Sequence, residues 1–289
     1  MTSIEPNSPK PPVVNAMTVD VEDYFQVSAL ETVCPRSSWS SSDYRVKNNV
    51  YKILELFGSH GVKATFFTLG CIAEEYPGMI REVVDAGHEI ASHGWEHVRV
   101  SQQQPEEFRQ DITRTRGVLE DISGTAVTGY RAASYSINAE NLWALDILAE
   151  AGYRYSSSIA PVRHDLYGMP DAPRFAFDAA GGALREIPIT TVRVAGRNIN
   201  CAGGGWFRLF PYAFSRWALR QVNEQENEAA VFYFHPWEID PEQPRFKNLA
   251  LKSRFRHYLN LEKMHPRLDR LLKDFQWARM DEVFMGANQ

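Results

Sequence analysis

The chain has 289 residues, of which 44% are hydrophobic, and its 31 basic and 36 acidic residues give a net charge of −5. This acidic balance argues against nucleic acid as a partner, because binding to phosphates requires a surplus of basic side chains. No stretch reaches the roughly 18 consecutive apolar residues of a membrane-spanning helix, so we expect no transmembrane segment.

The N-terminal part of the chain combines a proline-rich tail with a buried strand. Residues 1–12 contain prolines but no apolar segment of the kind found in a secretory signal, so we expect a flexible tail there. The next segment, Val13–Val19, is apolar and β-prone, which predicts a strand. Three carboxylates, Asp20, Glu22 and Asp23, follow it directly. They could cap a helix or lie in solvent, or one of them could bind a metal.

Helices and strands alternate along most of the chain. Apolar residues at helical spacing predict four helices, Asn48–Gly58, Tyr76–Ala86, Pro105–Ile122 and Ala139–Ala151. Short apolar runs predict strands at Ala64–Leu69, His88–Ala91, Tyr153–Ile159, Leu184–Ile189 and Ala229–His235. Such alternation is typical of a parallel α/β fold, which binds its ligands at the carboxyl ends of the strands.

Two histidines follow the strand at His88–Ala91. His93 and His97 are four residues apart, and on a helical turn such a pair lies on one face and can bind one metal ion. The same spacing also occurs in surface pairs that bind nothing. With one carboxylate from the first strand end, however, the pair completes the two-imidazole, one-carboxylate set of a catalytic divalent metal.

An arginine and a histidine follow two further strand-like segments. Arg131 comes after a short run at Gly129–Tyr130, and Tyr135 is close to it in the sequence. Taken alone, Arg131 could equally be an ordinary surface cation. His235 ends an apolar aromatic run just before a proline, and Trp237 follows. A single histidine at this position would more often be structural.

Two segments in the C-terminal part of the chain can each be interpreted in two ways. Trp206 follows three consecutive glycines, which predicts either a backbone that a saccharide can approach closely or a flexible connector. The segment lacks the ending of a phosphate-binding loop. From Pro241 to Trp277 the chain is rich in arginine, lysine and aromatic residues. This composition is typical of a solvated helical face, and the alternative is a surface for an anionic substrate or a membrane.

These segments resemble, in their order along the chain, the polysaccharide deacetylases of the NodB-homology group, carbohydrate esterase family four. The resemblance lies in Thr18–Phe25, Ser92–His97, Arg131–Tyr135 and Phe234–His235. It implies a distorted, incomplete (β/α)7-type barrel of parallel strands. We therefore expect a single domain over residues 13–289, including a helical C-terminal extension from about residue 241, because no Gly/Ser linker divides the chain.

A narrower resemblance links the chain to the deacetylases of bacterial exopolysaccharide and exosortase gene clusters. It rests on the opening Val19–Phe25, on Gly203–Arg208, on Phe234–Glu238 and on the basic C-terminal tail. It implies a role in exopolysaccharide biosynthesis.

By resemblance, Asp20 is the catalytic base, and Asp23, His93 and His97 hold the metal. Zinc is the expected ion, and cobalt, nickel and iron accept the same ligands. The family pattern has two adjacent aspartates, whereas two residues separate Asp20 from Asp23 here, so Glu22 is an alternative ligand.

The resemblance also implies roles outside the metal group. Arg131 would orient Asp20, and His235 would be the general acid. A backbone N–H near Ser134 or Tyr135 would face the oxyanion, although this chain lacks the proline of the family's arginine motif. We expect Tyr135, Trp206 and Trp237 to contact the substrate.

The implied activity is that of a metal-dependent hydrolase that removes acetyl groups from N-acetylated amino sugars, acting on carbon–nitrogen bonds other than peptide bonds. Two alternatives are an allantoinase-like amidohydrolase on a small cyclic amide and a saccharide-binding homologue without turnover.

Three scattered cysteines, Cys34, Cys71 and Cys201, fit free thiols in a reducing compartment. With the absence of a signal-like segment, they predict a cytoplasmic protein. A saccharide linked to a lipid or to a nucleotide is then the expected substrate. The sequence carries no signal for an oligomeric state.

Overall fold

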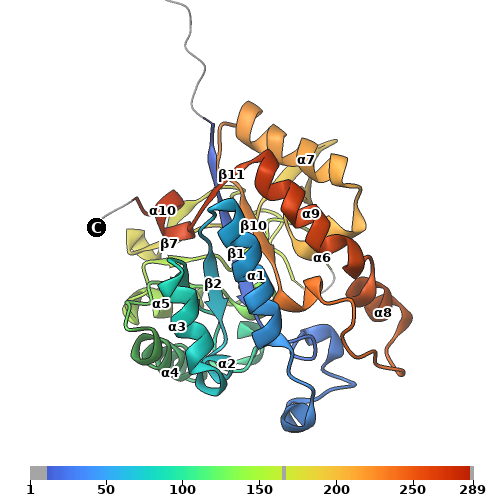
Figure 1. The fold of residues 1–289 in the computed structure, drawn as a ribbon. Helices are drawn as coiled ribbons and strands as arrows, with labels where there is room; N and C mark the ends of the chain where they lie inside the picture. Colours follow the sequence, from blue (N-terminus) through green and yellow to red (C-terminus); the bar gives the residue numbers. More distant parts are fainter. Residues whose placement is uncertain (1–11, 165–166, 287–289) are drawn as a thin grey trace, which may run out of the picture.

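A computed structural model describes residues 12–164 and 167–286 and shows a mixed α/β fold around one large sheet (Figure 1). The sheet has nine strands, and along its main path their order is β10-β1-β2-β3-β4-β5-β7-β6. The strands on this path are β10 (Val231–Phe234), β1 (Val14–Val21), β2 (Thr65–Thr68), β3 (Glu89–Ser92), β4 (Gly129–Tyr130), β5 (Tyr155–Ser156), β7 (Leu184–Glu186) and β6 (Phe177–Ala179). All neighbours pair in parallel except β6 and β7, which are antiparallel.

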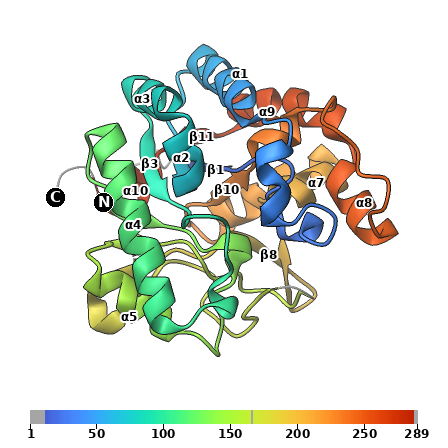
Figure 2. The same ribbon diagram turned by 90° about the horizontal axis from the view of Figure 1, so that it is seen from below.

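Helices cover the outside of the curved sheet, as Figures 1 and 2 show from two directions. The helices are α1 (Val46–His60), α2 (Gly70–Glu75), α3 (Pro77–Asp85), α4 (Pro105–Ser123), α5 (Trp143–Glu150), α6 (Gly204–Leu209), α7 (Tyr212–Arg220), α8 (Leu251–Tyr258), α9 (Leu261–Asp274) and α10 (Met280–Phe284). Because the sheet is covered on its outer face and filled on its inner face, all but the first residue of β1 are buried. None of the helices in the described ranges is long and apolar enough to cross a membrane.

The expected fold class is confirmed: the structure is a mostly parallel α/β sheet in a distorted, incomplete barrel with a C-terminal extension. Each helix and strand predicted from periodicity has a counterpart within a few residues of the predicted bounds. The expected flexible tail falls almost wholly on residues 1–11, which lie outside the described residues.

The C-terminal extension is not purely helical. After α9, the strand β11 (Gln276–Ala278) pairs in parallel with the N-terminal half of β1. Trp277 of this strand is buried against Phe232 of β10. The end of the chain is therefore fastened to its first strand, a contact that the composition of the segment does not reveal.

A second, smaller sheet packs against the main core through Val192. It consists of β8 (Thr191–Val194) and β9 (Arg197–Asn200), which form an antiparallel hairpin. After this hairpin, Gly203 forms a single parallel bridge with Tyr233 of β10. The hairpin and the bridge lead the chain back to the edge of the sheet, where α6 begins.

His88 makes the stability of the fold depend on pH. Its Nδ1 accepts a hydrogen bond from the Ala64 N–H at 3.0 Å, and its ring is buried against Phe57 and Phe66. Burial, together with the nearby cations Lys63 and Arg279, lowers the pKa of His88 from 6.5 to about 4. Its contribution to folding is therefore complete above pH 6.5 and is lost as the pH falls toward 4.

Substituting His88→Asn tests this, because the Asn oxygen can accept from Ala64 but does not titrate. The free energy of unfolding of the wild type, measured relative to that of the variant, should fall by up to about 3 kcal/mol between pH 6.5 and 4. The measurement is urea unfolding at several pH values. A difference between the two proteins that does not change with pH would contradict the assignment.

Candidate metal and catalytic site

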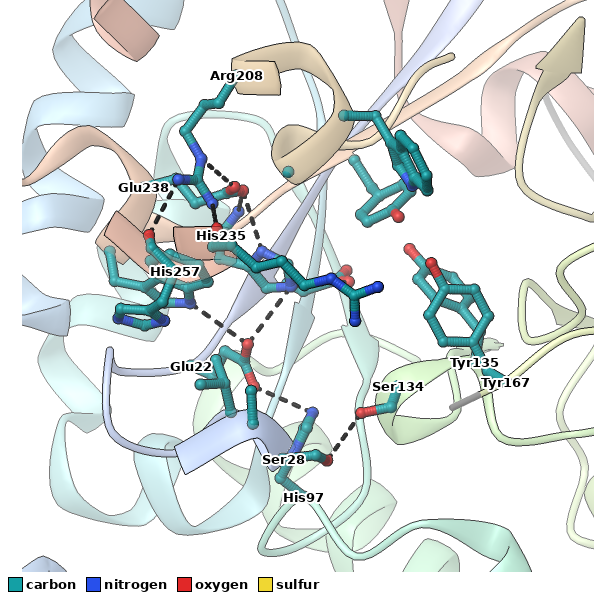
Figure 3. A pocket seen from close by; sticks show the side chains of 18 of the residues that line it. Glu22, Ser28, His97, Ser134, Tyr135, Tyr167, Arg208, His235, Glu238 and His257 are labelled. Atoms are coloured by element: carbon teal, nitrogen blue, oxygen red, sulfur yellow. Dashed lines mark hydrogen bonds and ion pairs between the residues drawn. The ribbon is translucent and has the colours of Figure 1, made fainter. Parts of the chain in front are cut away.

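The carboxyl ends of β1, β3, β4 and β10 meet at one pocket of about 270 Å³. Parallel pairing brings these ends to the same edge of the barrel, so residues far apart in sequence become neighbours. Asp20, His93 and His235 all line the pocket. Figure 3 shows its interior.

Glu22, His93 and His97 form one buried group at the floor of this pocket. Each offers one ligand atom, and these atoms all lie within 4.8 Å of one another. Glu22 follows β1 directly, and His93 follows β3. This is the only group of three or more His, Cys, Asp or Glu residues in the described ranges with metal-binding geometry.

The two histidines reach the site from a loop, so the prediction that they lie on a helical turn is wrong. The backbone leaves β3 at Ser92 and does not enter a helix before Val100. His97 adopts a positive φ of 56°, which turns its ring back toward His93. The ring of His93 is fixed by a 2.8 Å hydrogen bond between its Nδ1 and the carbonyl oxygen of Arg131, which leaves Nε2 for a metal.

The residues of this group fit a divalent cation. Glu22 Oε2 is buried and has no hydrogen bond within the described residues, although it lies only 3.0 Å from His97 Nε2. Burial raises the pKa of Glu22 to about 7 and lowers the pKa values of His93 and His97. A bound cation would favour an ionised carboxylate and two neutral imidazoles, and thus would stabilise a group that is costly to bury alone.

Both carboxylate oxygens of Asp23 accept hydrogen bonds from backbone N–H groups. The structure therefore favours the alternative carboxylate, Glu22, as the metal ligand. Asp23 Oδ1 accepts the N–H of Tyr24 at 2.8 Å. Its Oδ2 accepts the N–H groups of Arg45 and Val46 at 2.7 and 2.8 Å. Asp23 therefore satisfies donors at the start of α1, which is the helix-capping role that acidic residues commonly have.

Asp20 is held beside the metal group by Arg131. The Arg131 side chain is wholly buried and donates from Nη1 to Asp20 Oδ1 at 2.5 Å and to Thr18 Oγ1 at 2.8 Å. The surface alternative for Arg131 is therefore excluded. With Oδ1 engaged, Asp20 Oδ2 lies 3.9 Å from His235 Nε2, on the pocket side. This arrangement suits a base that accepts a proton from a water molecule in the pocket.

His235 has an acidic partner, Glu238, that our sequence analysis did not identify. Its Nδ1 lies 3.0 Å from Glu238 Oε2, and Glu238 Oε1 accepts from Arg208 Nε at 2.8 Å (Figure 3). Burial opposes ionisation of both groups, but Arg208 and His235 lower the pKa of Glu238 to about 2. Glu22, Glu238 and Asp20 raise the pKa of His235 to about 9. These three carboxylates thus favour a proton on His235, and its Nε2 lies 3.4 Å from Glu22 Oε1 at the pocket.

The glycines before Trp206 make room for this chain of residues. A side chain on Gly204 would lie 1.9 Å from Glu238 Oε2, and one on Gly203 would lie 2.4 Å from the Tyr233 ring. The flexible-connector interpretation is wrong, because α6 begins at Gly204. Trp206 is on this helix and lines the pocket.

The aromatic residues expected to contact substrate lie at the pocket, in different environments. Tyr135 is buried, and its hydroxyl has no hydrogen-bond partner within the described residues. Ser134 and Tyr135 both have positive φ, 54° and 51°. Trp237 lies between the rings of His235 and His257, stacked on both, and its Nε1 donates to Glu22 Oε1 at 3.4 Å. Trp237 therefore orients His235 and Glu22 within the site.

One of the backbone N–H groups that we expected to face the oxyanion, that of Tyr135, is engaged in a backbone hydrogen bond. The N–H of Tyr135 already donates to the carbonyl of Ala132 at 3.0 Å. The Tyr135 hydroxyl, in contrast, has no hydrogen-bond partner among the described residues. Because Tyr135 lines the pocket, a ligand or water there could be that partner.

Fold and site together define a barrel protein with a buried group of two imidazoles and one carboxylate, a set that could hold a metal ion and leave coordination positions open. Comparison with known families agrees. Residues 32–156 match the model of the polysaccharide deacetylase family. Residues 157–285 match a domain of unknown function, DUF3473. His235, Glu238 and Arg208 all lie in this second segment.

Curated relatives match only part of the chain. It is 31% identical over 88 residues to the peptidoglycan-N-acetylglucosamine deacetylase PgdA of Listeria monocytogenes, covering 30% of this chain and 19% of the relative. It is 30% identical over 97 residues to a chitooligosaccharide deacetylase of Bradyrhizobium, covering 34% of this chain and 42% of the relative. The chain thus spans less than half the length of either relative.

A solved structure matches the whole fold. A Mycobacterium smegmatis protein, assigned provisionally as a polysaccharide deacetylase, superposes with a TM-score of 0.59 and 21% identity. The match covers 98% of this chain and 93% of that one, so the arrangement of both segments in one barrel recurs there.

Two neighbouring carboxylates should respond differently to substitution. Glu22→Gln should weaken zinc binding by more than about 100-fold, since changes to residues that only support a ligand already cost 10–100-fold. Asp23→Asn should leave zinc affinity nearly unchanged but lower the free energy of unfolding by about 1–3 kcal/mol, because it disturbs three backbone donors, two of them buried. Titration calorimetry and urea unfolding measure the two effects. The reverse pattern would assign the ligand to Asp23.

Proposed function

We propose that the protein is a metal-dependent deacetylase of N-acetylated amino sugars, in a polysaccharide or in its oligosaccharide precursor. The observation that carries the proposal is the convergence of Asp20, the Glu22–His93–His97 group and His235 on one pocket. This set offers a base, a metal site and a general acid. The relatives named for removing acetyl groups from amino sugars support the same reaction.

Each residue of the site has its own role in the proposed reaction. A divalent cation at Glu22, His93 and His97 would polarise the acyl carbonyl and make an attacking water more acidic. Asp20 would accept the proton of that water through Oδ2, while Arg131 balances its charge. His235, protonated on Nε2, would donate to the departing amine as the C–N bond breaks. The products are acetate and a free amino sugar.

The pocket supplies groups that could recognise a sugar. Tyr135 presents a buried hydroxyl without a partner, and Trp206 presents an aromatic surface at the wall. We propose that Tyr135 donates to the substrate and that Trp206 stacks on a sugar ring, because aromatic faces and isolated polar groups are typical of such sites. Zinc is the ion that this ligand set most often holds in hydrolases.

The biological setting is a further part of the proposal. We infer a role in exopolysaccharide biosynthesis from the resemblance of Val19–Phe25, Gly203–Arg208 and Phe234–Glu238 to deacetylases of those gene clusters. A saccharide linked to a lipid or nucleotide, on the cytoplasmic side, is the proposed substrate. Fractionation of cells that produce the native protein tests the location.

Acetate release tests the proposed reaction. The zinc-loaded protein should release acetate from N-acetylglucosamine oligomers. Asp20→Asn should lower kcat by about 10²–10⁴-fold while keeping zinc, because only the proton acceptor is lost. His93→Ala should lose both zinc and activity. Zinc content measured on the same samples separates the two defects.

The same assay distinguishes the alternatives. Turnover of allantoin without acetate release would indicate the small-amide hydrolase. A protein that binds zinc and oligosaccharide but releases no acetate would be a saccharide-binding homologue.

A further inference from the structure

Glu186 is a buried carboxylate that the proposed reaction leaves without a role. It is the last residue of β7, and its side chain is wholly buried. Its Oε2 has no hydrogen-bond partner among the described residues. Burial raises the pKa of Glu186, although Ser156, two backbone N–H groups and Arg131 oppose this shift. Because a buried carboxylate is costly, a position selected for stability alone would favour a neutral side chain.

The other carboxylate oxygen of Glu186 holds the loop that follows β5. Glu186 Oε1 accepts the N–H groups of Ser158 and Ile159 at 2.9 and 2.8 Å. Strand β7 pairs in parallel with β5, and Ser156 of β5 lies opposite Glu186. One oxygen atom thus fixes two successive backbone N–H groups close to the point where the chain leaves β5.

The same loop holds the side chain of Arg131. The carbonyl oxygen of Ser157 accepts from Arg131 Nε at 3.2 Å, and the Ser157 hydroxyl accepts from Arg131 Nη2 at 3.0 Å. The Ser158 hydroxyl accepts the N–H of Ala132 at 2.9 Å, so the backbone beside Arg131 is held as well. These contacts leave Arg131 Nη1 directed at Asp20.

One peptide unit joins Glu186 to Arg131. The peptide between Ser157 and Ser158 donates its N–H to Glu186 Oε1, and its C=O accepts from Arg131 Nε. In a planar trans peptide these two groups point in opposite directions, so the peptide lies between the two side chains. A carboxylate at the N–H also polarises the C=O and makes it a better acceptor for a cation.

We propose that Glu186 is a positioning residue for the proposed base. It fixes the peptide between Ser157 and Ser158, which holds Arg131, and Arg131 in turn holds Asp20. The effect on catalysis rests on the proposed function, whereas the placement of Arg131 does not. Glu186 belongs to the segment that matches DUF3473, so this segment supports the base as well as the general acid.

Two substitutions at Glu186 test the role of its hydrogen bonds in acetate release. Glu186→Gln keeps an oxygen that can accept from Ser158 and Ile159, and its kcat should stay within about threefold of the wild type. Glu186→Ala removes the acceptor and should lower kcat by about 10–100-fold, since misplacing a reacting group by about 1 Å costs about 100-fold. KM should change by less than about twofold in both variants, because Glu186 is not among the described residues that line the pocket.

Glu89 provides a matched control at the other end of the sheet. It is the first residue of β3, and its carboxylate accepts from the hydroxyl groups of Tyr155 and Thr65. Glu89→Ala should lower the stability of the fold and leave kcat and KM unchanged. If Glu89→Ala and Glu186→Ala lose stability and kcat equally, Glu186 is only structural and the proposal is overturned. A wild-type kcat in Glu186→Ala would also overturn it.

Urea unfolding tests the placement of Arg131 without turnover. Ser157→Ala removes the hydroxyl that accepts from Arg131 Nη2. The factor by which Ser157→Ala raises the unfolding equilibrium constant should be at least about threefold smaller in the Glu186→Ala background than in the wild type, because the loop is already displaced. Equal factors in the two backgrounds would overturn the proposal. A wild type that shows this coupling but releases no acetate would contradict the proposed function and support the placement of Arg131 by Glu186.

Discussion

The buried ion pair between Arg131 and Asp20 is the interaction on which the site depends. Arg131 also donates to Thr18 of β1 and to Ser157 after β5, and its own carbonyl oxygen fixes His93. One side chain and its backbone thus position the proposed base, one proposed metal ligand and three strand ends. Removing either partner of a buried pair typically costs about 3–5 kcal/mol, so the same contact supports both the fold and the chemistry.

The other half of the site comes from the second segment of the chain. Glu238 accepts a hydrogen bond from Arg208 of α6 and contacts His235. Trp237 lies between the rings of His235 and His257, and it donates a hydrogen bond to Glu22. Arg208 also anchors the end of α8. The segment that matches DUF3473 therefore completes the pocket and connects it to helix α8 at the edge of the molecule.

Much of the fold could be predicted from the sequence, because strands and helices of a parallel barrel differ clearly in apolar periodicity. The ligand after β1 was predicted less well, although the signal was present. Strand β1 ends at Val21, where the Glu22 N–H turns back to the Asp20 carbonyl; Glu22 then lies at the pocket, and Asp23 accepts from the start of α1. His93 and His97 were assigned to a helix because their spacing fits one, but Gly94 and His97 both have positive φ, which breaks helical geometry.

Other features depend on contacts that local patterns do not encode. The pairing of β11 with β1 joins segments some 260 residues apart. The His235–Glu238 contact had a local signal, since an acidic residue three positions after a helix-start residue, with proline between, is a capping pattern. The role of Arg208 and the tight fit of Gly204 against Glu238 became evident only in three dimensions.

We propose that Glu22, His93 and His97 hold one metal ion beside Asp20 and His235. The most direct test is anomalous X-ray scattering at the zinc edge from crystals grown with zinc. We expect one strong peak within bonding distance of these three side chains, with Asp23 still bound to the backbone at the start of α1. A peak at Asp23, or no peak at the Glu22–His93–His97 group in zinc-saturated crystals, would contradict it.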